Sequence, residues 1–299
     1  MAFPAHHPFR SPAARDRFLA LCEERARRWP VPFDEHFVET SFGKTFARTS
    51  GPEGAPPLVL LPGATASSLM WAPNVRALCE AFRVFAIDPI YEWGKSVFTK
   101  LPRAPAEFCA WLVELLDGLG LRAPVHLAGM SYGGWVAAEL ALRRPERLRS
   151  VILLAPGNVV LPLSWSVIAR LFTMLIPHPR FVRSYMNWMF ADAVQQGGEG
   201  QRFVDEFAHD AFVGRQCHPL RAGAKLRVFD DAELASISVP LLFVVGANEK
   251  IYPAAEAVAR LRRVAPQIHT EIVDHAGHDL TFAQPKRVND MILAFARRF

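Results

Sequence analysis

Cysteines are scarce in this chain of 299 residues, and the four that occur stand far apart at Cys22, Cys79, Cys109 and Cys217. No two of them have the C-x-x-C spacing of a paired metal-ligand or redox motif. The sequence therefore predicts reduced, mostly buried thiols, with neither a zinc site nor a disulfide framework.

A long uninterrupted hydrophobic run is also missing. The most apolar stretch, Val159–Ile176, contains Pro162, two serines and Arg170, whereas a membrane-spanning helix needs about 20 apolar residues. The N-terminal region has no apolar segment with a cleavage signal, and its arginines between Arg15 and Arg28 alternate with acidic residues. We therefore expect no membrane span and a cytoplasmic location.

Positive charge is in excess but not concentrated. The formal net charge is +5 and the isoelectric point is about 9.2, yet the arginines occur singly or in pairs among Asp and Glu residues. No segment is basic enough to read as a nucleic-acid-binding arm, so we expect solvated helix faces and no nucleic-acid partner.

Short apolar runs alternate with helical patterns along most of the chain. This alternation predicts an α/β fold whose mostly parallel sheet is covered on both faces, because a sheet exposed on one side would alternate polar and apolar residues. The expected strands are 58–61, 84–87, 125–128, 151–154, 241–245 and 270–273, and the expected helices are 105–119, 134–144, 253–264 and 285–298.

The N-terminal region predicts two additions to this core. Residues 11–29 have helical periodicity and end at Pro30. Two alternating runs, 37–41 and 45–49, are joined by a tight turn at Gly43 and are typical of an antiparallel hairpin. We therefore expect an N-terminal helix and a mixed sheet.

Between Pro156 and Ser236 the alternation stops, and aromatic residues and methionines accumulate. A structureless loop of this length is improbable in a compact domain, which favours a helical insertion. The expected organisation is a core in two parts, 1–156 and 236–299, with a helical lid at 157–235. The candidate pocket residues in this lid are Trp165, Tyr185, Trp188 and Met189, although such residues also serve to fix a lid to its core.

The pentapeptide Gly129-Met130-Ser131-Tyr132-Gly133 lies between an expected strand and an expected helix. A serine in this G-x-S-x-G pattern sits on a strand-to-helix turn so tight that the flanking positions need small residues. The motif alone is weak, but its context favours Ser131 as a nucleophile.

A serine hydroxyl needs a base within hydrogen-bond reach. Of the ten histidines, His278 follows Ala276-Gly277 on a loop between the last expected strand and the C-terminal helix. This loop is expected at the carboxyl edge of the sheet, where the turn that contains Ser131 must also lie. His275 is the nearest alternative.

An acid must orient that base. Glu249 stands at the carboxyl end of the strand before the last one, three residues after Gly246. The acid can also stand at the end of the strand that follows the helix after Ser131. At that position the sequence reads Gly157-Asn158, which has no carboxylate. Asp274 and Asp279 are alternatives, but each adjoins the histidines and would have to fold back to reach the ring.

The chain order Ser131, Glu249, His278 resembles that of the α/β-hydrolase superfamily over roughly residues 35–299. The segments 248–253 (NEKIYP) and 88–96 (DPIYEWGKS) are similar to a subgroup of small bacterial esterase-like proteins. The resemblance implies an oxyanion hole made by the backbone N–H groups of Tyr132 and Ala64. Two departures from the family pattern are Pro62 in place of a histidine and an altered loop after Asp88, which bears on pocket shape.

The resemblance implies a serine hydrolase that acts on carboxylic esters with apolar or aromatic groups and needs no metal or organic cofactor. Carbon-carbon bond hydrolases, lactonases and thioesterases use the same triad and remain alternatives, as does a non-catalytic ligand-binding relative. The expected partner is a small-molecule ester, and the expected assembly is a monomer or homodimer.

Overall fold

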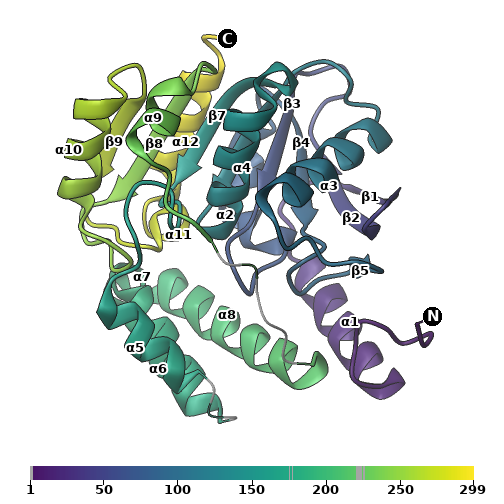
Figure 1. Cartoon of the computed structure of the whole chain (residues 1–299). Coiled ribbons are helices and arrows are strands. Elements are labelled where there is room, and N and C mark those ends of the chain that lie inside the picture. The colour runs from purple at the N-terminus through teal and green to yellow at the C-terminus, as the bar shows by residue number, and fades with distance from the viewer. Residues whose placement is uncertain (1–2, 175, 177, 220–223, 225) are drawn as a thin grey trace.

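A computed structural model describes residues 3–174, 176, 178–219, 224 and 226–299, and its centre is a mixed β-sheet (Figure 1). The strand order is β1-β2-β4-β3-β6-β7-β8-β9, and β5 pairs with β2. The strands are β1 (Asp34–Thr40), β2 (Gly43–Ser50), β3 (Pro57–Leu61), β4 (Arg83–Asp88), β5 (Val97–Phe98), β6 (Val125–Met130), β7 (Leu148–Leu154), β8 (Leu241–Gly246) and β9 (His269–Val273).

The front of the sheet is antiparallel and the rest is parallel. β1 pairs with β2 so that Phe37 lies opposite Phe46, and β2 pairs antiparallel with β4. From β4 through β3, β6, β7 and β8 to β9, neighbouring strands run in the same direction. The expected mixed sheet is therefore confirmed, and each of the six core strands extends one to three residues beyond its predicted range.

Helices cover both faces of the sheet (Figure 1). α3 (Pro105–Gly118) packs on α4 (Tyr132–Arg143), and α2 (Ala72–Leu78) packs on α12 (Pro285–Ala296) on the opposite face. This double cover explains why β6 and β8 are buried along their whole length. The remaining helices are α10 (Ala254–Val264), α11 (Leu280–Ala283) and α9 (Asp231–Ser236), which overlaps the end of the expected insertion. Two 3₁₀ turns are η1 (Ser68–Trp71) and η2 (Pro145–Arg147).

Four helices form the expected insertion between β7 and β8: α5 (Trp165–Thr173), α6 (Pro179–Met189), α7 (Ala191–Gln196) and α8 (Gly198–Cys217). Figure 1 shows them as a layer at the bottom of the molecule, below the sheet. Residues 175, 177, 220–223 and 225 of the expected insertion lie outside the described residues. In the described part of the chain, no helix is both long enough and apolar enough to cross a membrane.

The N-terminal helix α1 (Pro12–Ala26) begins after Ser11, whose hydroxyl accepts a hydrogen bond from the N–H of Ala14. It ends three residues before the predicted end at Trp29, because the chain turns there and the Trp29 indole N–H donates to Ser50 Oγ at 3.0 Å. α1 packs along α8, so the N-terminal segment contacts the insertion (Figure 1).

Candidate active site

Ser131 occupies the turn between β6 and α4 in an unusual backbone conformation. Its φ is 51° and its ψ is −112°, a combination that L-residues avoid and that occurs where the surrounding structure imposes it. α4 begins at Tyr132, two residues earlier than predicted, so the serine stands directly at the end of the strand. The turn is that of a nucleophile elbow.

The glycines of the pentapeptide allow this turn to close. A Cβ atom at Gly129 would lie 2.5 Å from the carbonyl carbon of Gly133, and one at Gly133 would lie 2.5 Å from the carbonyl oxygens of Leu61 and Pro62. Both distances are far below van der Waals contact, so the small residues are required by the close approach of three backbone segments.

The structure brings Ser131, His278 and Glu249 together from three separate loops. His278 Nε2 lies 3.0 Å from Ser131 Oγ, and His278 Nδ1 lies 3.1 Å from Glu249 Oε2. Because a carboxylate can only accept hydrogen bonds, Nδ1 carries the ring hydrogen and the lone pair of Nε2 faces the serine hydroxyl. This is the arrangement that a histidine base requires.

Backbone groups fix the Glu249 carboxylate. Its Oε1 accepts hydrogen bonds from the N–H groups of Lys250 at 2.7 Å and Ile251 at 3.0 Å, which leaves Oε2 for the histidine. The carboxylate is fully buried, and the side chain of His278 is 9% exposed. Water therefore has little access to the pair, which strengthens its electrostatic interaction.

The alternative base and acids lie elsewhere. His275 is exposed on the turn before His278, and the Asp274 carboxylate approaches Arg287 at 3.7 Å. Asp279 is buried, but its two carboxylate oxygens accept hydrogen bonds from the backbone N–H groups of Gly277 at 2.9 Å and Ala193 at 2.8 Å.

Asp279 has a supporting position that the sequence analysis missed. Its two hydrogen bonds join the turn that carries His278 to the first turn of α7, and burial raises the pKa of its carboxyl group. The only signal in the sequence was its adjacency to His278, which argued against Asp279 as the acid and gave no indication of this supporting role.

The segments that carry the expected oxyanion donors both adjoin Ser131. Tyr132 is the first residue of α4, where an N–H group has no partner within the helix. Ala64 lies in the loop after β3, and this loop passes against the serine: a Cβ atom at Gly63 would be 3.3 Å from Ser131 Cβ. The two amides thus belong to segments that meet at Ser131.

The altered loop after β4 serves this region in a way that the sequence did not reveal. Asp88 accepts hydrogen bonds from the N–H groups of Ser68 and Lys95, as expected for a residue that caps a turn. Glu92 accepts one from the N–H of Thr65 at 2.7 Å, directly after Ala64.

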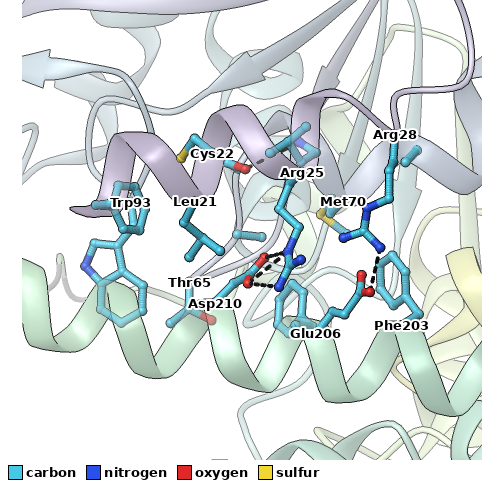
Figure 2. Close-up of a pocket in the computed structure, with 16 residues that line it drawn as sticks. Leu21, Cys22, Arg25, Arg28, Thr65, Met70, Trp93, Phe203, Glu206 and Asp210 are labelled. Carbon is cyan, nitrogen blue, oxygen red and sulfur yellow. Dashed lines mark hydrogen bonds and ion pairs between the residues drawn. The ribbon is translucent and has the colours of Figure 1, made fainter. Parts of the chain in front are cut away.

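A cavity of about 240 Å³ lies between α1 and α8, beside this loop (Figure 2). None of the four expected pocket residues lines it. Trp165 is 83% exposed, and Trp188 is covered by the Arg170 guanidinium at 4.5 Å. Met189 is buried in the main core, and Tyr185 packs against that core. Both residues therefore fit the alternative that they fix the insertion to the core.

Among the described segments, no cluster of three or more His, Cys, Asp or Glu side chains could hold a metal ion. All four cysteines are free thiols. Burial raises the pKa of Cys109 to about 12 and that of Cys79 to about 11, so both remain protonated at neutral pH.

Comparison with known proteins gives a consistent result. The chain is 34% identical over 279 residues to carboxylesterase YbfK of Bacillus subtilis, covering 93% of each chain. It is 33% identical to the uncharacterized carboxylesterase nap of the same organism, covering 93% of this chain and 92% of the relative. The crystal structure of naproxen esterase from Bacillus subtilis superposes with a TM-score of 0.86 at 32% identity, over 95% of this chain and 99% of that one.

A match to a family profile begins in β3 and covers the later strands, the serine turn and the insertion. Residues 58–291 match the Alpha/beta hydrolase family. With a match over most of its length and relatives above 30% identity along nearly the whole sequence, the chain belongs to the Alpha/beta hydrolase family.

Proposed function

We propose that this protein is a serine hydrolase that cleaves carboxylic esters with apolar or aromatic groups through an acyl-enzyme formed on Ser131. The observation that carries this proposal is the hydrogen-bonded chain from Ser131 Oγ through His278 to Glu249, with distances of 3.0 and 3.1 Å. The names of the relatives, which describe carboxylesterases, favour esters among the substrates open to such a triad.

The reaction follows from the direction of these contacts. His278 Nε2 takes the hydroxyl proton as Ser131 Oγ attacks the ester carbonyl carbon, and the Glu249 carboxylate stabilises the imidazolium that forms. His278 then gives the proton to the departing alkoxide, which leaves as an alcohol. Water, deprotonated by the same ring, attacks the acyl-enzyme and releases the carboxylic acid and the free serine.

The N–H groups of Ala64 and Tyr132 receive the negative charge that develops on the carbonyl oxygen. Their backbone segments meet at Ser131, and preorganised donors of this kind are worth about 3–4 kcal/mol of barrier each. In this proposal the insertion 157–235 acts as a cap over the site. Its support is Asp279, which bonds the histidine turn to α7.

The test is hydrolysis of p-nitrophenyl esters from acetate to laurate, together with fluorophosphonate labelling and mass spectrometry of the labelled peptide. We expect turnover and one label per chain on Ser131, both lost in Ser131→Ala. A labelled Ser131 without ester turnover would shift the assignment to a carbon-carbon bond or thioester substrate. Absence of both signals would refute the serine hydrolase.

A further inference from the structure

The cavity between α1 and α8 has a mostly apolar wall (Figure 2). Ten of its sixteen lining residues are apolar, including Phe18 and Leu21 from α1 and Phe203 and Phe207 from α8. Trp93, in the loop after β4, closes one end. Such a surface favours an alkyl or aryl group over a charged one.

The cavity shares a wall with the proposed oxyanion loop. Thr65 and Ala66, which directly follow Ala64, line it, and so does Met70. Met70 Sδ lies 3.3 Å from the backbone nitrogen of Gly63, the residue that packs against Ser131. The cavity therefore adjoins the loop that carries Gly63 and Ala64, and this same loop contacts Ser131.

Ion pairs neutralise the charges along the cavity. Arg25 and Asp210 form a pair with contacts of 2.9 to 3.1 Å, and Arg28 contacts Glu206 at 2.6 Å (Figure 2). The Arg25 pair joins α1 to α8, and the Arg28 pair joins the segment just after α1 to α8. The more buried arginine is Arg25, whose side chain is 14% exposed. Because every cation here faces a carboxylate, the wall offers no free charge to an ionic substrate.

From these observations we infer that the cavity binds the apolar group on one side of the ester carbonyl, so that α1 and α8 determine substrate size. This inference rests on the proposed function. The cavity volume of about 240 Å³ equals that of about eight water-sized groups, each of which occupies roughly 30 Å³. A medium alkyl chain or a substituted phenyl ring suits this volume.

The test is a substitution that fills the cavity, Leu21→Trp, with Ala20→Trp on the exposed side of the same helix as the control. The values of kcat/KM are measured for p-nitrophenyl acyl esters from acetate to laurate and for acetate esters of alcohols from ethanol to octanol. We expect the ratio for eight-carbon over two-carbon groups to fall at least tenfold for Leu21→Trp in one series. Ala20→Trp keeps the ratio of the unmodified protein.

The two series decide which side of the ester enters the cavity, and a ratio unchanged in both overturns the inference. Phe207→Ala, which enlarges the same cavity, provides a second variant and shifts the preference toward longer groups. Failure of the unmodified protein to hydrolyse any ester would refute the proposed function, whereas turnover with an unaltered size profile in both variants refutes the cavity alone.

A separate observation concerns Glu92 and Thr65. Thr65 has a φ of 60°, a left-handed conformation that is unfavourable for a β-branched residue. Its N–H donates to Glu92 Oε2 at 2.7 Å, and among the described residues no Lys or Arg pairs with Glu92. Loss of contact with water raises the pKa of the Glu92 carboxyl to about 8, against the opposing effect of the Thr65 hydrogen bond.

The geometry points to Glu92 as a positioning residue that holds the oxyanion loop by fixing Thr65, the neighbour of Ala64. The carboxyl group does not need to be charged for this role, because a neutral carbonyl oxygen also accepts the Thr65 hydrogen bond. Glutamine supplies such an oxygen and alanine does not.

We expect Glu92→Ala to lower kcat at least tenfold with KM within about threefold, since loss of a well-placed oxyanion donor acts on the transition state. Glu92→Gln restores kcat to within about threefold of the unmodified protein. A purely structural role would lower the melting temperature without this split between kcat and KM. Unchanged kcat in Glu92→Ala, or equal loss in both variants, overturns the assignment.

Discussion

The carboxylate of Glu249 divides its two oxygens between its own loop and His278. One oxygen accepts hydrogen bonds from the N–H groups of Lys250 and Ile251, and the other lies 3.1 Å from the His278 ring. The backbone therefore sets the direction of the carboxylate, and the carboxylate sets the orientation and tautomer of the histidine.

Glu249→Gln should lower kcat by about 100-fold or more without loss of folding. The amide keeps the shape of the side chain but removes the charge that stabilises the imidazolium, and its NH₂ group favours the wrong histidine tautomer. Steady-state kinetics with a p-nitrophenyl ester provides the measurement. Glu256→Gln, on the exposed side of α10, is the matched control, and near-normal kcat in Glu249→Gln would assign the acid to another residue.

His278→Ala should abolish turnover, whereas His275→Ala should leave it within about twofold. Of these two rings, that of His278 lies at hydrogen-bond distance from Ser131 Oγ, whereas His275 is exposed three residues away. Ester hydrolysis and the rate of fluorophosphonate labelling are compared for the two variants. The opposite pattern would identify His275 as the base.

Replacement of Ser131 by glycine should give a protein at least as stable as Ser131→Ala, with both variants inactive. The backbone at Ser131 is held at φ 51° and ψ −112°, which costs a residue with a Cβ atom about 1–3 kcal/mol and glycine much less. Glycine also gains entropy in the unfolded chain, which offsets about 1 kcal/mol. Urea unfolding of the two variants measures the difference, and a clearly less stable glycine variant would contradict strain at this position.

Glu92 should make stability fall as pH rises. The pKa of its carboxyl is raised from 4.5 to about 8 in the folded protein, so the folded state holds a proton that the unfolded state has lost. This contribution is fully present below pH 4.5 and disappears as the pH approaches 8. The free energy of unfolding of the unmodified protein, minus that of Glu92→Gln, should therefore decrease between pH 5 and 8, and a constant difference would contradict the shifted pKa.

Several features followed from local sequence because they depend on neighbouring residues. The core strands were recognisable as apolar runs, because parallel strands that are covered on both faces bury every side chain. Ser131 read as a nucleophile because the tight turn needs Gly129 and Gly133. The order of the elements placed His278 and Glu249 at the same edge of the sheet as the serine.

Other features depended on contacts between segments far apart in the chain. The aromatic residues of the insertion gave no sign of which faced a cavity: Trp165 is exposed, whereas Phe203 and Phe207 of α8 line the cavity together with α1, a helix far away in sequence. The short β5 and α2 were missed because their few residues carry too little periodicity to separate them from loops.

The sequence by itself determined the fold class and predicted the residues of the proposed triad, because both depend on residue type, spacing and order. Only the tertiary structure decided that Glu249 rather than Asp279 faces the imidazole, that Glu92 holds Thr65, and that α1 lines the cavity. The physical reason is that hydrogen-bond direction and cavity shape arise from how distant segments pack, and no local pattern records that packing.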